Sequence, residues 1–130
     1  MKQRILIIED NEQNLYLLKF LLEKHGLEVI EAYDGPQGIE AARESQPDLV
    51  LLDIQLPGMD GYEVARALRR DVLPAEVPIV AVTSYAMPGD REKAEAAGCI
   101  GYLEKPITPE KFVRDISVFL PVEENVRGNS

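Results

Sequence analysis

The chain has 130 residues, a formal net charge of -9 at pH 7 and 45% hydrophobic residues. This length fits one domain with its own core, and the excess of acid argues against a nucleic-acid-binding protein, which needs clustered Lys and Arg. The apolar runs are far shorter than the roughly 18 residues of a membrane span. The first run is followed by acidic residues after a stretch too short for the hydrophobic core of a signal peptide.

The first part of the chain predicts two strands, each followed by a helix. Residues 5–8 (ILII) are apolar at every position, which is typical of a strand covered on both faces of a sheet. A helix is expected over residues 12–25, because Gly26 is well placed for a left-handed C-terminal cap. Residues 27–31 alternate apolar and polar side chains, as an edge strand does, and a second helix is expected over residues 36–45.

The rest of the chain repeats this alternation three times. Residues 49–52 and 79–82 are again apolar throughout, whereas residues 100–104 alternate like an edge strand. Prolines stand in the first turn of three of the five predicted helices. The last three helices are expected over residues 62–70, 88–97 and 109–120.

Five strands alternating with five helices predict an α/β fold, a parallel sheet with helices on both faces. Three interior and two edge strands fit the flavodoxin-like, doubly wound order 2-1-3-4-5. We expect the domain to cover residues 1–121, and residues 122–130 to form a polar, disordered tail. In such a sheet, ligands bind beyond the carboxyl ends of the strands.

The residues at the carboxyl ends of these strands form an acidic set. Glu9 and Asp10 follow the first strand, and Asp53 follows the third. Because like charges so close together repel strongly, this set predicts a hard divalent cation, and oxygen ligands suit Mg²⁺. Lys105, after the fifth strand, can pair with Asp53, and the Thr83 hydroxyl, after the fourth, can donate a hydrogen bond. An aspartate nucleophile with these neighbours indicates that an aspartyl phosphate forms there.

The segments that carry these residues resemble a known family. LIIEDNEQN, DLVLLDIQLPGMDGYE, IVAVTSYAM and GYLEKPI occur in the order of bacterial response-regulator receiver domains, over residues 4–120. The resemblance implies a phosphorelay protein that takes a phosphoryl group from a histidine kinase or histidine phosphotransfer protein and then switches a protein-interaction surface. It implies a signalling domain that assists its own phosphorylation and dephosphorylation, rather than an enzyme. The amino-acid sequence of these segments is especially similar to that of stand-alone cell-cycle regulators of the DivK type and of receivers of hybrid kinases.

The resemblance also implies roles for individual residues of the acidic set. Asp53 is then the phosphoacceptor. Mg²⁺ is ligated by Asp10, by Asp53 and by the backbone carbonyl of Gln55. Glu9 acts on the metal through a bound water, and Lys105 contacts the phosphoryl group.

Further roles concern the response to phosphorylation. By the resemblance, Thr83 is the switch hydroxyl, Tyr102 is the aromatic side chain that turns inward when Thr83 moves, and the Lys105–Pro106 peptide bond is commonly cis. Taken alone, Tyr102 fits an ordinary half-buried tyrosine equally well. The side chains of Gln55 and Tyr85 are expected to flank the path of an attacking water, so that the Tyr85 ring prolongs the life of the phosphoprotein.

Three other classes compete with this interpretation. A haloacid-dehalogenase type of phosphatase needs a second aspartate two residues after the nucleophile, where this chain has Gln55. A nucleotide-binding flavodoxin-like domain needs a glycine-rich turn after the first strand, where Glu9 and Asp10 would repel phosphate. A pseudo-receiver, which is never phosphorylated, is disfavoured by the complete set of residues at the strand ends.

The first predicted helix carries more apolar residues than one buried face needs. Tyr16 and Phe20 fall on its polar face, with Leu17 at the border, so we expect an exposed aromatic patch that docks the histidine protein. In the alternative, neighbouring helices cover these rings. Four leucines share the opposite face, which can cover the sheet: Leu15, Leu18, Leu21 and Leu22.

Two remaining residues and the chain ends complete the expectations. Cys99 is the only cysteine, so no internal disulfide forms, a cytoplasmic location is favoured, and the side chain is expected to be a small buried hydrophobe. His25 is expected to complement a helix C-terminus. Met1 and the natural-looking tail favour a complete stand-alone protein over a piece of a hybrid kinase, with a protein as its downstream target and no nucleic acid or membrane partner.

Overall fold

The computed structural model describes residues 3–84 and 87–120. Tyr85 and the predicted tail, residues 122–130, lie outside the described residues. The strands are β1 (Arg4–Ile8), β2 (Glu28–Ala32), β3 (Leu49–Asp53), β4 (Ile79–Thr83) and β5 (Gly101–Glu104). The helices are α1 (Glu12–Lys24), α2 (Gly35–Ser45), α3 (Gly61–Asp71), α4 (Asp90–Ala96) and α5 (Pro109–Ser117).

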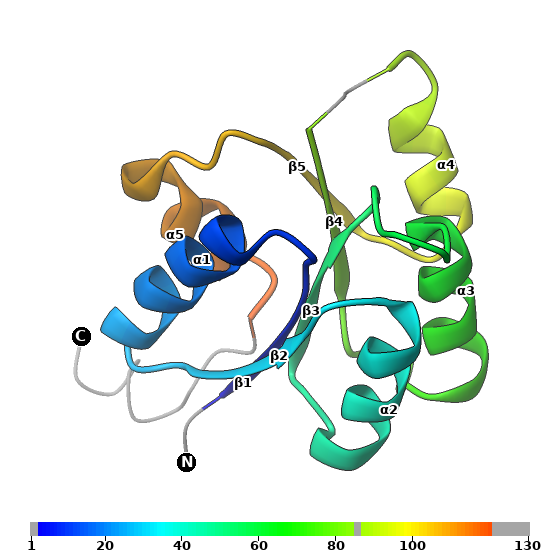
Figure 1. Cartoon of the computed structure of the whole chain (residues 1–130), viewed down its shortest axis with the longest axis horizontal. Helices are drawn as coiled ribbons and strands as arrows, with labels where there is room; N and C mark the ends of the chain where they lie inside the picture. Colours follow the sequence, from blue (N-terminus) through cyan, green and yellow to red (C-terminus); the bar gives the residue numbers. More distant parts are fainter. Residues whose placement is uncertain (1–2, 85–86, 121–130) are drawn as a thin grey trace.

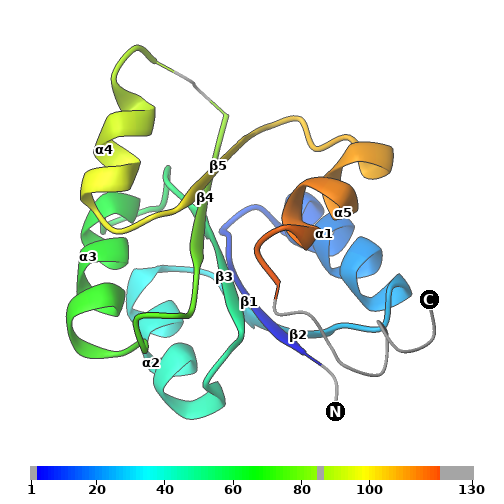
Figure 2. The ribbon, with the colours of Figure 1, turned by 180° about the vertical axis from the view of Figure 1, so that it is seen from behind.

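The five strands form one parallel sheet in the order β2-β1-β3-β4-β5. Helices α1 and α5 cover one face, and α2, α3 and α4 cover the other, as Figures 1 and 2 show from opposite sides. The predicted doubly wound α/β fold and its strand order are therefore confirmed. The two strands that alternate in sequence, β2 and β5, are the edges of the sheet.

Each face of the sheet has its own hydrophobic core. Side chains along β1 alternate between them: Leu6 and Ile8 lie in the core under α2, α3 and α4, and Ile5 and Ile7 lie in the core under α1 and α5. Strands β3 and β4 alternate in the same way and are buried at every position. An interior strand with helices on both sides has no solvent face, so its sequence shows no polar alternation.

Three predicted helices are shorter in the structure than in the sequence analysis: α1 by one residue, and α4 and α5 by three residues each. Helix α4 was expected from Pro88, but Gly89 has a left-handed φ of 89° and the helix begins at Asp90. Pro88 therefore lies outside the helix, and prolines occupy the first turn of α2 and α5 alone among the five. Helix α4 has one fully buried residue, Ala94, and no side-chain cap at its start. Helix α5 was expected to reach residue 120 and ends at Ser117.

Helix α1 begins just after the acidic residues that follow β1. The Asn11 side chain accepts a hydrogen bond from the Asn14 N–H at 2.9 Å, which caps the helix two residues after Glu9. At the other end, His25 Nδ1 lies 2.9 Å from the Leu21 carbonyl oxygen, where it complements the last turn as expected. In the described part of the chain, no helix has both the length and the apolar character that crossing a membrane requires.

Candidate functional site

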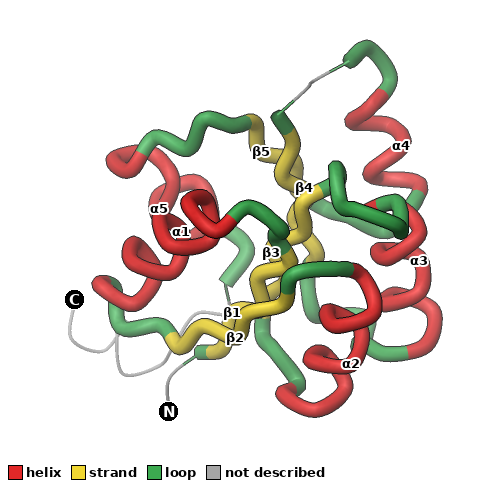
Figure 3. Tube along the Cα trace, in the orientation of Figure 1, coloured by secondary structure: helices red, strands yellow, loops and turns green. Residues whose placement is uncertain are grey.

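The carboxyl ends of the five parallel strands lie at one end of the sheet, where loops follow them (Figure 3). The predicted site residues are the last residues of these strands or the first residues after them. The register brings these residues to similar levels. Asp53 at the end of β3 is level with Val82, and Thr83 at the end of β4 is level with Glu104. Glu9 follows β1, the other neighbour of β3. Parallel topology thus gathers side chains that are far apart in sequence.

Three carboxylates converge at the carboxyl end of the sheet. Glu9, Asp10 and Asp53 each offer an oxygen atom, and these atoms all lie within 4.8 Å of one another. Glu9 and Asp53 are 1% and 3% exposed, whereas Asp10 is exposed to solvent. The cluster can therefore receive a cation from the solvent side while two of its members stay fixed in the protein.

The Asp53 carboxylate is held at both oxygens. Its Oδ1 accepts a hydrogen bond from the Gln55 N–H at 2.8 Å, and its Oδ2 lies 3.3 Å from Lys105 Nζ. Burial, followed by the nearby Glu9 carboxylate, raises the pKa of Asp53 to about 7, although the Gln55 N–H and Lys105 oppose the shift. A positive charge at the cluster would favour the ionised form, which is the form that can act as a nucleophile.

Lys105 connects two of the acids. Its Nζ lies 2.8 Å from Glu9 Oε1, closer than the 3.3 Å to Asp53 Oδ2. Burial opposes the charge of Lys105, but the Glu9 and Asp53 carboxylates outweigh it and raise the Lys105 pKa. The predicted pair with Asp53 is present, while the shorter contact with Glu9 was not anticipated. The Lys105–Pro106 peptide bond is cis.

The loop after β3 carries a second contact that sequence reasoning missed. The Gln55 side chain reaches to the end of β4, where its Nε2 donates to Thr83 Oγ1 at 2.6 Å and its Oε1 accepts from the Ser84 N–H at 3.1 Å. A turn closed by the Gln55 N–H on Asp53 positions this side chain. Only the two-residue spacing from Asp53 signalled it, and that spacing does not give the direction of the side chain. The proposed metal contact of the Gln55 carbonyl stays a prediction.

Gly61, at the start of α3, lies against this loop without space for a side chain. A Cβ atom there would be 2.5 Å from the Ile54 Cα and 2.8 Å from the Asp53 carbonyl oxygen. The Gly61 N–H also donates to the Ile54 carbonyl at 3.1 Å. The close approach of the helix start to the strand end therefore fixes the backbone that carries Asp53.

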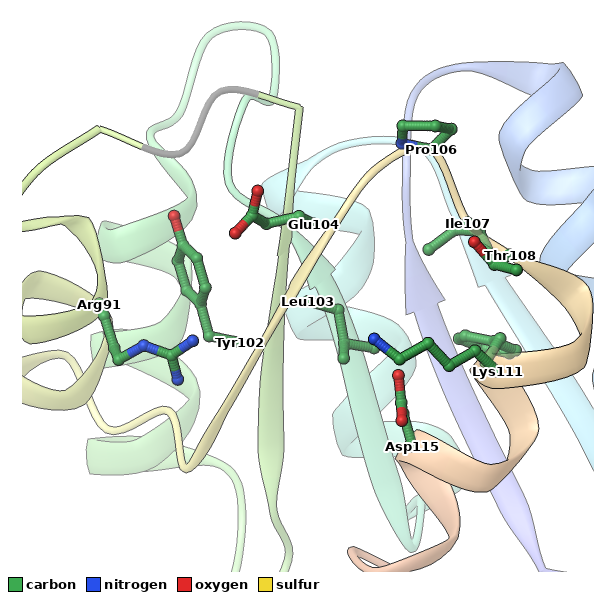
Figure 4. A pocket seen from close by; sticks show the side chains of 10 residues that line it. Arg91, Tyr102, Leu103, Glu104, Pro106, Ile107, Thr108, Lys111 and Asp115 are labelled. Atoms are coloured by element: carbon green, nitrogen blue, oxygen red, sulfur yellow. The ribbon is translucent and has the colours of Figure 1, made fainter.

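Tyr102 lies on β5 beside α4. In Figure 4 its ring stands next to Arg91, whose guanidinium carbon is 5.1 Å from the ring centre. Burial raises the pKa of Tyr102, with Asp90 and Glu104 adding to the effect and Arg91 and Thr83 opposing it. The hydroxyl is buried, and within residues 3–84 and 87–120 it makes no hydrogen bond of ordinary geometry. A hollow of about 340 Å³ adjoins the ring, lined by residues of β5 and α5 as well as Arg91.

The aromatic patch on α1 is exposed. Tyr16 and Phe20 are 72% and 52% exposed, and their stacked rings have centroids 6.5 Å apart. Leu17 is partly buried against the core under α1 and α5. The four leucines of the opposite face are buried as expected. Neighbouring helices therefore leave the two rings accessible to another molecule.

Cys99 is buried, as expected for a small hydrophobe. Burial raises the pKa of its thiol to about 11, with Arg69 opposing the shift slightly. The thiolate, which is the reactive form of cysteine, is therefore strongly disfavoured at neutral pH.

Comparisons with known proteins agree with this geometry. The family described as response regulator receiver domain matches residues 5–117. The polar-differentiation response regulator DivK of Brucella anthropi is 41% identical over 120 residues, covering 92% of this chain and 98% of DivK. The receiver domain of the sensor histidine kinase PA1611 from Pseudomonas aeruginosa, solved with magnesium in its active-site cleft, is 34% identical with a TM-score of 0.82, covering 92% and 98% of the two chains. CheY4 of Vibrio cholerae has a TM-score of 0.87 at 26% identity, covering 92% of this chain and all of CheY4 (100%).

Proposed function

Because the chain belongs to the response regulator receiver domain family, whose members act in two-component signalling, we propose that Asp53 is its phosphoacceptor. One observation carries this proposal. Asp53 is the buried carboxylate that combines a raised pKa with contacts to a lysine and a backbone N–H, at the centre of an acidic cluster. An aspartate in these surroundings can be made a nucleophile when positive charge is supplied to it.

Mg²⁺ is the cofactor that fits the cluster. Glu9, Asp10 and Asp53 present only oxygen atoms, and the backbone carbonyl of Gln55 would add another oxygen. Two of the carboxylates are buried next to each other, so their mutual repulsion favours a divalent cation. When bound, the ion supplies positive charge that stabilises the anionic oxygens of a phosphoryl group.

The residues around Asp53 have distinct roles in phosphoryl transfer. A P–O bond forms to an Asp53 carboxylate oxygen as the P–N bond of the donor phosphohistidine breaks. Lys105, already within 3.3 Å of Asp53, is placed to hold a phosphoryl oxygen, and the Thr83 hydroxyl is placed to donate to another. Movement of Thr83 is transmitted to Tyr102, whose buried hydroxyl makes no ordinary hydrogen bond within the described residues and can therefore gain one. The same groups assist loss of the phosphoryl group, so the protein contributes to both reactions without being an enzyme in the usual sense.

The donor is a histidine kinase or histidine phosphotransfer protein, and it docks on α1. Tyr16 and Phe20 form the exposed part of this surface, with Leu17 at its buried border. Exposed aromatic side chains of this kind are frequent anchors of protein interfaces. The helix begins two residues after Asp10, so a partner lying along it reaches the acidic cluster.

The assignment of Asp53 is tested with acetyl phosphate and Mg²⁺, followed by intact-mass measurement. The wild-type protein should gain one phosphoryl group, and Asp53→Asn should gain none. Glu40→Gln serves as the control, because it removes an exposed carboxylate on α2 far from the cluster in sequence and should leave modification unchanged. Full modification of Asp53→Asn would show that another residue accepts the group.

The docking surface is tested with Phe20→Ala and a cognate histidine protein. Loss of an exposed aromatic anchor should lower the rate of transfer about tenfold, the effect of losing about 1.4 kcal/mol at an interface. Modification by acetyl phosphate should not change. Ile100→Ala is the control, since Ile100 is 62% exposed and precedes β5 rather than lying on α1. If both reactions slow together, Phe20 supports the fold; if neither slows, the partner binds elsewhere.

A further inference from the structure

The Gln55 side chain connects the loop after β3 to the end of β4 through two hydrogen bonds. Its amide nitrogen donates to the Thr83 hydroxyl oxygen at 2.6 Å, and its amide oxygen accepts from the Ser84 N–H at 3.1 Å. Both partners follow Val82, the residue of β4 that is level with Asp53. These two hydrogen bonds, the Gln55 bridge, therefore lie just beyond the Asp53 carboxylate, at the carboxyl end of the sheet, where a group attached to Asp53 would project.

The two groups that Gln55 engages are the ones that β4 offers to an anion. A phosphoryl group has only acceptor oxygens, so it needs the Thr83 O–H and the Ser84 N–H as donors. The Gln55 oxygen already occupies the Ser84 N–H, and the Gln55 nitrogen fixes the position of the Thr83 oxygen. The Ser84 N–H cannot donate fully to both the Gln55 oxygen and a phosphoryl oxygen. The Thr83 oxygen accepts from Gln55, so this bond restrains its position without using the O–H that a phosphoryl oxygen needs.

The Gln55 side chain can also release Thr83 and Ser84 without a movement of its own backbone. Its backbone N–H is fixed to Asp53 Oδ1 at 2.8 Å, so the base of the side chain stays in place while the amide can swing away. Gln55 and Ser84 are both exposed, so a released amide would be hydrated at little cost. The bridge is therefore a reversible one.

We propose that the Gln55 amide competes with the phosphoryl group for the Ser84 N–H and restrains the Thr83 hydroxyl in the position it has before phosphorylation. In the unphosphorylated protein it holds the end of β4 in place. It must release the Ser84 N–H before that group can bind a phosphoryl oxygen, and it must release the Thr83 oxygen before Thr83 can move. It thereby lowers the affinity of the site for a phosphoryl group and opposes the movement of Thr83. Gln55 is a positioning residue in this role, which rests on Asp53 being the phosphoacceptor.

The test uses beryllofluoride, an analogue of the phosphoryl group, titrated with Mg²⁺ into the full chain and followed by calorimetry and backbone NMR. Gln55→Met keeps the length of the side chain but removes both hydrogen bonds. This variant should bind beryllofluoride about tenfold more tightly than the wild type, as expected when a competing contact worth roughly one net hydrogen bond is lost. Without ligand, its Ser84 amide resonance should already be shifted from the wild-type position.

Three further variants separate the explanations. Gln13→Met, at an exposed position of α1, should bind like the wild type, so that methionine itself is not the cause. If Gln55→Ala binds more tightly but Gln55→Met does not, bulk rather than hydrogen bonding opposes the ligand and the proposal is overturned. Equal or weaker binding by both Gln55 variants overturns it as well. If Asp53→Asn binds beryllofluoride as the wild type does, the phosphoacceptor assignment itself fails.

Discussion

Replacing Asp53 with asparagine should make the metal-free protein more stable, and more so at high pH. The pKa of Asp53 is raised from 3.8 to about 7, chiefly by burial and then by Glu9. A carboxyl whose pKa is raised in the folded state binds a proton more tightly there than in the unfolded chain. Stability is therefore lost as the pH rises from about 4 to about 7, and the loss is complete above pH 7. Asparagine does not titrate and avoids this loss.

The expected size follows from the two pKa values. Raising a carboxyl pKa from 3.8 to about 7 costs the folded protein about 4 kcal/mol once the group is ionised. The stability difference between Asp53→Asn and wild type should therefore grow by about 3 kcal/mol between pH 5 and pH 8. This corresponds to a shift of roughly 2 M in the midpoint of urea unfolding.

The assay is urea unfolding followed by circular dichroism at several pH values, with EDTA present to exclude divalent ions. Glu40→Gln is the matched control, because Glu40 is exposed on α2 and its difference from wild type should not vary with pH. Added Mg²⁺ should stabilise the wild type more than Asp53→Asn and so reduce the difference at pH 8. A pH-independent difference, or a variant less stable than the wild type at pH 8, would refute the reasoning.

Three other substitutions probe contacts around the site. Gly61→Ala should lower the free energy of unfolding by about 3 kcal/mol, because the new methyl group overlaps the Ile54 Cα and the Asp53 carbonyl. Thermal unfolding measures this loss, and an unchanged melting temperature would contradict it. Lys105→Met should lower the free energy of unfolding by about 3 kcal/mol at pH 8, because it leaves two buried acids without their cation. The loss should be smaller at pH 5, where Asp53 is protonated. Equal losses at both pH values would argue against the ion pair between Lys105 and Asp53. Tyr102→Phe should stabilise the unphosphorylated protein by about 1 kcal/mol, because the described residues give its buried hydroxyl no ordinary hydrogen bond; a loss of stability in urea unfolding would reveal a partner.

Much of the fold could be predicted because the strands carry a strong signal. Residues 5–8, 49–52 and 79–82 are apolar throughout, and this pattern is produced by burial on both faces, as in the interior strands of a parallel sheet covered by helices on both sides. Topology then placed the functional residues, since the ends of neighbouring parallel strands must meet. The boundaries of α4 were wrong by two residues at its start, because the left-handed conformation of Gly89 depends on the local turn.

Side-chain directions could not be predicted in the same way. The sequence placed Lys105 and Asp53 at adjacent strand ends, but the choice between Glu9 and Asp53 as nearer partner depends on distances of 2.8 and 3.3 Å. That Gln55 flanks the path of an attacking water stays a prediction, but the hydrogen bonds of its amide to Thr83 and Ser84 were not foreseen. Such contacts depend on rotamers within a short loop, and these are set by the assembled site rather than by spacing along the chain.

The weak anchoring of α4 has a consequence for local unfolding. Its seven residues bury one side chain fully, Ala94, and its start lacks a side-chain cap, so detaching it exposes little apolar surface. Its amide hydrogens should exchange with deuterium through opening of this helix alone, while those of β1, β3 and β4 should exchange only when the whole domain unfolds. Each such opening withdraws Arg91 from the Tyr102 ring, so the ring loses this contact whenever α4 opens.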